Sequence, residues 1–160
     1  MIFPKQSLFS FISEHIADAQ FQPAGVDITL NRVLSFSSPG HIDFDNSERR
    51  ISTTEEVPFQ GGWAELGEGA YKVIFNEYVK IPKDAAAFCF PRSSLLRSGI
   101  TLECAVWDPG YEGRSEALLL VKNPHGARLK KNARVGQLVF ARLSEPSTDS
   151  YEGIYKGENR

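Results

Sequence analysis

Short apolar runs fill most of the sequence after residue 25, and this pattern most constrains the fold. Pro, Gly, Asn and Ser separate the runs, which is typical of short strands joined by tight turns. The runs span residues 26–30, 32–36, 71–81, 86–90, 101–107, 117–121 and 135–143. Many strands of this length are typical of a sandwich, a barrel or a jelly roll. The sequence therefore predicts an all-β fold.

Residues 7–19 differ from the rest of the chain in their periodicity. Leu8, Phe9, Ile12 and Ile16 recur at helical spacing, and polar residues occupy the positions between them. The spacing predicts one short N-terminal helix, the only substantial helix of the protein.

Two internal stretches and the C-terminus lack this apolar patterning. Residues 37–48 are rich in Asp and Ser, and residues 58–69 are rich in Gly, so both are predicted to be long loops or hairpin arms. Residues 144–160 are polar apart from a few aromatic and aliphatic side chains. With 160 residues and 41% apolar content, we predict one domain over residues 1–143 and a tail over 144–160.

Charge and cysteine usage exclude several classes of function. The net charge is −2, so no long-range field favours nucleic acid or an anionic membrane, and any phosphate site must be local. Cys89 and Cys104 lack the spacing of a zinc site or a redox pair, and we expect buried free thiols. The N-terminus, with Lys5 and interspersed polar residues, fits neither a signal peptide nor a membrane span. A reducing cytoplasm is the expected location.

The densest polar constellation follows the run at residues 86–90. Arg92, Ser93, Ser94 and Arg97 stand within six residues, between a predicted strand and the next apolar run. Arginine forks pair with phosphate oxygens, and hydroxyls supply further donors. The segment is therefore a candidate phosphate site, and the alternative is a solvated loop.

A second constellation begins about ten residues later, at the end of the predicted strand over residues 101–107. Asp108 precedes Pro109 and Gly110, so a strand end holds its carboxylate beside whatever the turn encloses. The alternative is that Asp108 merely begins a β-turn, as Asp often does before Pro-Gly.

In this order, the motifs resemble those of the trimeric dUTPase and dCTP deaminase superfamily. Arg-Ser-Ser at 92–94 and Asp-Pro-Gly-Tyr at 108–111 are similar to its central motifs. Ala-Gly-Val-Asp-Ile at 24–28 looks like the first motif, and Arg-Val-Gly-Gln-Leu-Val-Phe at 134–140 looks like the fourth. Residues 76–82 also resemble a strand of the archaeal members. The resemblance covers residues 23–143.

This resemblance implies a distorted jelly roll that assembles as a homotrimer, with each active site between subunits. It also implies Mg²⁺ bound mainly through the triphosphate and an Asp, here Asp108, that activates a water molecule. Attack of that water on the α-phosphorus yields a nucleoside monophosphate and pyrophosphate. A carboxylate can deprotonate water while arginines and metal neutralise the leaving pyrophosphate. The expected activity is a dUTP diphosphatase.

The resemblance also assigns roles to other residues. Tyr111 would pack against the deoxyribose and exclude a ribose 2′-hydroxyl. Arg92, Ser93, Ser94 and Arg97 would bind phosphates or support the site. Gln137 matches a site glutamine, and Asp27 matches the acidic residue of the first motif, near the metal and the structural core.

The sequence departs from the superfamily pattern in the base site. Typical dCTP deaminases carry a glutamate in the strand after the Asp-Pro-Gly turn, but residues 117–121 are Ala-Leu-Leu-Leu-Val. Glu116 would reach the site only if a bulge absorbed two extra residues. Leu102 stands where many dUTPases carry Asn, so backbone groups from Leu102 to Ala105 would read the base. The alternatives are therefore a dCTP deaminase, alone or bifunctional, and an inactive nucleotide-binding jelly roll.

The tail differs from the Gly-rich arm that closes the site of classical dUTPases. Residues 151–157 look more like the tail of archaeal deaminase-type members. Tyr155 would stack on a bound nucleotide and Lys156 would meet a phosphate if this tail closed over the site as a lid. An inert or trimer-docking tail is the alternative.

Overall fold

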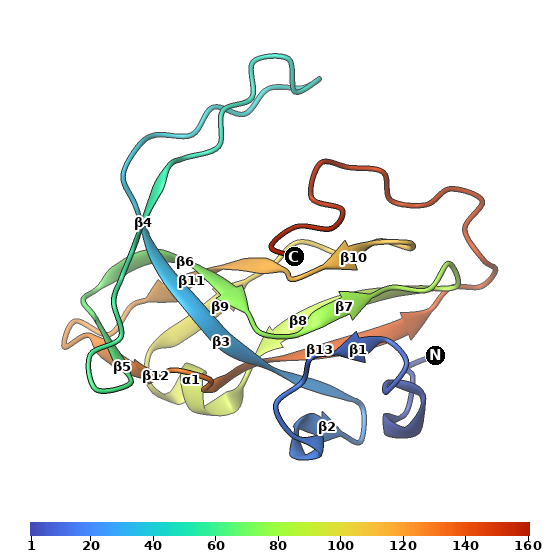
Figure 1. Ribbon diagram of the computed structural model, residues 1–160, viewed down its shortest axis with the longest axis horizontal. Coiled ribbons are helices and arrows are strands. Elements are labelled where there is room, and N and C mark those ends of the chain that lie inside the picture. Colours follow the sequence, from blue (N-terminus) through green and yellow to red (C-terminus); the bar gives the residue numbers. More distant parts are fainter.

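The computed structural model describes residues 1–160, and almost all of its regular structure is antiparallel β-strand (Figure 1). The strands are β1 (Ile12–Ser13), β2 (Phe21–Gln22), β3 (Gly25–Phe36), β4 (Thr54–Glu56), β5 (Trp63–Leu66), β6 (Gly69–Phe75), β7 (Tyr78–Lys80), β8 (Ala85–Pro91), β9 (Ile100–Glu103), β10 (Glu112–Gly113), β11 (Glu116–Val121), β12 (Ala127–Lys130) and β13 (Arg134–Arg142). The only α-helix is α1 (Ser93–Arg97), and two 3-10 turns are η1 (Lys5–Ser7) and η2 (Asp18–Gln20).

Three sheets make up the barrel-like body. The largest has the strand order β8-β13-β3-β6-β11-β9, and β2 and β4 also pair with β3. The second has the order β1-β7-β10, and the third consists of β12 and β5. This arrangement confirms the predicted all-β class.

Strand β3 joins two runs that the sequence predicts as separate strands. The pairing of β3 with β6 shifts its register between Leu30 and Arg32. Asn31, the polar residue that divides the two apolar runs, therefore lies at a β-bulge instead of a turn. The bulge lets one 12-residue strand serve two parts of the barrel.

The predicted N-terminal helix over residues 7–19 is wrong. Ile12 pairs instead with Val79 of β7, and Glu14 adopts a positive φ of 58°, which interrupts any helix. Leu8 and Ile12 are buried as the periodicity required, but Phe9 is half exposed. Helix propensity is a weak preference, and pairing with the edge of β7 outweighs it here. None of the helices in the structure combines the length and apolar character needed to cross a bilayer.

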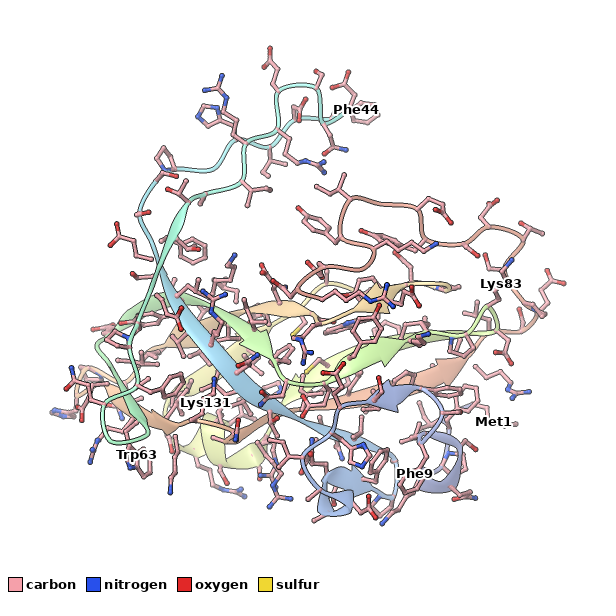
Figure 2. The ribbon with its side chains drawn as sticks, in the orientation of Figure 1. Met1, Phe9, Phe44, Trp63, Lys83 and Lys131 are labelled. Atoms are coloured by element: carbon pink, nitrogen blue, oxygen red, sulfur yellow. The ribbon has the colours of Figure 1, made fainter.

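The two predicted loops behave differently. Residues 58–69 include strand β5, which pairs with β12, so the prediction of a loop or arm there misses this strand. Residues 37–53 form the expected arm, which leaves the body between β3 and β4 (Figure 1). Figure 2 shows Phe44 at the tip of this arm, away from the sheets, where it is fully exposed.

The core lies between the sheets, and β11 shows most clearly how a strand contributes to it. In β11 every second residue is buried, so Leu119 is fully enclosed while its neighbours Leu118 and Leu120 are partly exposed. Burying a large aliphatic side chain stabilises the fold by about 1.5–3 kcal/mol. Cys89 and Cys104 are free thiols, as expected, and both are half-buried.

The tail over residues 144–160 returns along the body. Its backbone hydrogen bonds run from Ser147 N to Lys83 O and from Gly157 N to Glu112 O, at 2.8 and 2.7 Å. The C-terminus consequently lies beside β10 (Figure 1).

Candidate active site

Asp27 lies near the start of β3 and binds two arginines from neighbouring elements. Its side chain is 3% exposed, and Oδ2 lies 3.3 Å from Arg92 Nε and 3.2 Å from Arg134 Nη1. Burial raises the pKa of Asp27 above its usual range, and the two guanidinium groups act in the opposite direction. The carboxylate therefore serves to fix the position of Arg92, the residue immediately before α1.

A hollow of about 280 Å³ opens beside this ion pair. It brings together residues from β2, β3, β8, the start of α1 and β13, namely Gln22, Asp27, Phe90, Pro91, Arg92, Ser93 and Gln137. Three of the predicted phosphate or site residues, Arg92, Ser93 and Gln137, thus share one cavity. A guanidinium, a hydroxyl and an amide are donors suited to an anion.

The other two predicted phosphate residues, Ser94 and Arg97, lie elsewhere. Ser94 lines a separate hollow with Arg128, and Arg97 is exposed on α1. Within a single chain, neither residue joins the cavity of Arg92.

Asp108 lines a second hollow, of about 410 Å³. Trp107, the residue before it, exchanges two backbone hydrogen bonds of 3.0 Å with Ala87 of β8, which fixes the start of the turn. Gly110 takes a φ of 83°, and Tyr111 N donates to Asp108 O at 3.1 Å. Asp108 thus begins a turn, as the simpler interpretation held, and its exposed carboxylate also faces a cavity.

Tyr111 forms a buried wall of the same hollow. Its hydroxyl is 2.7 Å from Glu158 Oε1 and 3.0 Å from Ser115 Oγ, and its ring meets Tyr151 edge-on. Burial raises the pKa of Tyr111 well above its ordinary value, so the hydroxyl stays protonated at neutral pH. The hollow therefore combines a carboxylate with an immobilised aromatic ring.

The predicted base-reading segment contributes unequally to this hollow. Ala105 lines it, whereas the side chain of Leu102 is 3% exposed and lies in the core opposite Leu119. Leu102 can contribute only backbone groups. Strand β9 ends the large sheet and leaves one backbone edge unpaired there.

Glu116, the candidate deamination residue, also lines the hollow. Its carboxylate is engaged by Lys72 Nζ at 3.1 Å and by Asn159 Nδ2 at 3.2 Å. It stands at the first position of β11, before the leucine run, and its side chain is 28% exposed.

Tail residues complete the second hollow. Tyr151, Tyr155 and Glu158 line it, whereas Lys156 Nζ is bound by Glu152 at 2.8 Å and does not line it. The sequence alone did not identify Glu158 or Ser115. An isolated Glu in a polar tail and a Ser in a turn carry no pattern that would distinguish them.

The structure contains no group of three or more His, Cys, Asp or Glu side chains placed to hold a metal ion. Two arginines already neutralise the Asp27 carboxylate, so it is not suited to bind a metal ion directly.

The two hollows divide the predicted site between them. Arg92 and Asp108 lie in different cavities of the same chain.

The sequence profile of the dCTP deaminase-like family matches residues 6–143. The match includes every residue that lines the two hollows, apart from those of the tail. The chain belongs to the dCTP deaminase-like family. This membership agrees with the order of the four motifs in the sequence.

Curated members of this family include close relatives from archaea. The "Probable deoxyuridine 5'-triphosphate nucleotidohydrolase" of Methanosarcina mazei is 50% identical over 143 residues, covering 89% of this chain and 84% of the relative. The "Deoxyuridine 5'-triphosphate nucleotidohydrolase" of Methanocaldococcus jannaschii is 40% identical over 146 residues, covering 90% and 92%.

A solved structure shares the fold. The 2'-deoxycytidine 5'-triphosphate deaminase from Agrobacterium tumefaciens superimposes with a TM-score of 0.64 and 20% identity, covering 87% of this chain and 47% of that one. At this identity the likeness concerns the architecture alone.

Proposed function

We propose that this protein is a dUTP nucleotidohydrolase, which splits dUTP into dUMP and pyrophosphate with Asp108 as the general base. The observation that carries the proposal is the shared hollow of the Asp108 carboxylate and the Tyr111 ring. The names of archaeal relatives at 40–50% identity over most of the chain support the same substrate.

In this mechanism the carboxylate of Asp108 accepts a proton from a water molecule. The water oxygen forms a bond to the α-phosphorus, and the bond from that phosphorus to the bridging oxygen breaks. Pyrophosphate leaves with the electron pair of that bond. General base catalysis of this kind contributes about 10²–10⁴ in rate.

The phosphates would bind in and around the hollow that Arg92 lines. Arg92, Ser93 and Gln137 are the donors that face it, and Ser94 and Arg97 lie farther along the same helix. Mg²⁺ would be held mainly by the substrate phosphates and would neutralise part of their charge. Asp27 supports this site by orienting Arg92.

A homotrimer would unite the two hollows. Within one chain the proposed base and the proposed phosphate donors occupy different cavities, so a complete site needs the Asp108 hollow of one subunit and the Arg92 hollow of another. Phe88 and Phe90 lie on β8, the strand that leads to Arg92, and their side chains are 40% and 58% exposed. Exposed aromatic side chains of this kind suit a contact between subunits.

Selection of the sugar and the base follows from the Asp108 hollow. The Tyr111 ring would stack on the deoxyribose and leave no room for a 2′-hydroxyl. Backbone groups from Leu102 to Ala105 would read uracil. The tail would act as a lid in which Tyr155 stacks, and Lys156 would have to leave Glu152 to reach a phosphate.

We place this activity in the reducing cytoplasm, because both cysteines are free thiols and the proposed substrate is a deoxynucleotide.

The test of the proposed function is to incubate the protein and Mg²⁺ with dUTP, dCTP, dTTP and UTP separately, and to measure pyrophosphate and ammonia. Pyrophosphate from dUTP, with little from UTP, is the expected result. Tight triphosphate binding without pyrophosphate would instead identify an inactive nucleotide-binding jelly roll.

A second candidate function is deamination of dCTP, alone or together with the diphosphatase activity. It is favoured by the presence of Glu116 in the same hollow as Asp108. Before it could move protons at the base, Glu116 would have to be released from Lys72 and Asn159. Ammonia from dCTP that disappears in Glu116→Gln would establish this activity.

A further inference from the structure

Ser115 is a buried hydroxyl between two aromatic side chains of the Asp108 hollow. It is 3% exposed, and its Oγ lies 2.6 Å from Trp107 Nε1 and 3.0 Å from the Tyr111 hydroxyl. A buried serine with two such partners connects the residue before Asp108 to the ring proposed to contact the sugar.

The chemistry of the partners gives this set of hydrogen bonds one direction. An indole N–H only donates, so Ser115 Oγ accepts from Trp107. The Ser115 proton is then available to the Tyr111 oxygen, and the Tyr111 proton goes to the carboxylate of Glu158 at 2.7 Å. Each hydroxyl thus has one assigned donor and one assigned acceptor.

Packing restricts the Tyr111 ring as well. A Cβ added at Gly113 would lie 2.8 Å from the Tyr111 hydroxyl oxygen, closer than real Cβ contacts allow. The hydroxyl therefore occupies space that only a glycine leaves free. The Ser115 bond holds it there from within the body of the protein, whereas the Glu158 bond depends on the tail.

We propose that Ser115 is a positioning residue that fixes the Tyr111 ring and thereby sets the discrimination between deoxyribonucleotides and ribonucleotides. This inference rests on the proposed function, because it assigns Tyr111 to the sugar. Ser115 is 3% exposed, and Trp107 and Tyr111 engage its hydroxyl, so its effect on the sugar passes through Tyr111.

The test compares kcat/KM for dUTP and UTP in the wild-type protein, Ser115→Ala, Tyr111→Phe and the double variant. We expect the dUTP preference to fall about tenfold in Ser115→Ala, mainly through KM, since one net hydrogen bond corresponds to roughly that factor. In the Tyr111→Phe background the same change should have little effect. Ser35→Ala, which loses a hydroxyl bond to Glu55 O between β3 and β4, neither of which lines the hollow, is the matched control.

Two outcomes would overturn the inference while dUTP hydrolysis stands. One is an unchanged dUTP preference in Ser115→Ala, and the other is an equal loss with and without the Tyr111 hydroxyl. If Ser115→Ala does not fold because the indole N–H is left unpaired, Trp107→Phe removes that donor and should lower the preference in the same direction.

Failure of the proposed function gives a different result. If the wild-type protein hydrolyses neither nucleotide, the affinities for dUTP and UTP are measured by equilibrium titration. A preference for dUTP that falls in Ser115→Ala would uphold the role of Ser115, and a preference that does not change would overturn it.

Discussion

The carboxylate of Asp27 lies 3.3 Å from the guanidinium of Arg92 and joins β3 to the start of α1. We predict that Asp27→Asn raises KM for dUTP about tenfold, because Arg92 loses the charge that orients it and binding weakens by about 1.4 kcal/mol. Steady-state kinetics measure this change. Arg134→Ala removes the other cation from Asp27 and should raise KM less. Equal effects of the two variants would contradict a specific role for Arg92.

Asp108→Asn should lower kcat for dUTP by at least about 100-fold while leaving nucleotide affinity nearly unchanged. The amide keeps the shape of the side chain but cannot accept a proton from water. Single-turnover assays and equilibrium binding separate the two effects. Normal turnover in this variant would show that Asp108 is not the base.

Glu77→Gln should destabilise the fold by about 1–3 kcal/mol. The Glu77 carboxylate is fully buried and accepts hydrogen bonds from Gln20 Nε2, Thr29 N and Thr29 Oγ1 at 2.7, 2.9 and 2.5 Å. A glutamine would turn an N–H group toward one of these donors. Urea unfolding gives the free energy, and a variant as stable as the wild type would contradict the assignment.

The same residue predicts a pH dependence. Burial raises the pKa of Glu77 above its ordinary value of 4.5, so the folded protein binds this proton more tightly than the unfolded chain. Its contribution to stability is therefore fully present below pH 4.5 and is lost as pH rises through the folded pKa. The wild-type free energy of unfolding should fall, relative to Glu77→Gln, as pH increases from 4.5. A parallel pair of pH profiles would contradict this linkage.

Adjacent leucines of β11 provide a test of the core. Leu119→Ala should cost about 3–5 kcal/mol, because it leaves a cavity at a fully enclosed site. Leu118→Ala, on the other face of the same strand, should cost about 1 kcal/mol. Equal losses of unfolding free energy would mean that the alternation of β11 does not define its buried face.

Sequence patterns predicted the features that depend on local alternation and on motif order. The long strands β3, β8, β11 and β13 coincide with predicted apolar runs, two of them in β3, because the apolar side chains that these strands bury are adjacent in the sequence. The very short strands β1, β2 and β10 were not predicted. Two residues contain no detectable period, and only a partner strand from elsewhere in the chain defines them.

Nonlocal contacts also explain what the sequence missed at the site. The Asp108 turn was recognisable, but Glu158 joins it only because the tail returns to pair with residues near β10. Ser115 joins it through hydrogen bonds to Trp107 and Tyr111, which the folded chain brings within reach. The separation of Arg92 from Asp108 within one chain is likewise a property of the folded body. No local spacing encodes either feature.

The position of β13 bears on how the protein is made in the cell. Residues 134–142 are synthesised after both β3 and β8, yet they lie between these two strands in the large sheet. Until they leave the ribosome, β8 and β3 have exposed, unpaired edges that other chains could join. Nascent chains should therefore depend on chaperones or rapid completion, and ribosome stalling shortly before residue 134 should favour aggregation.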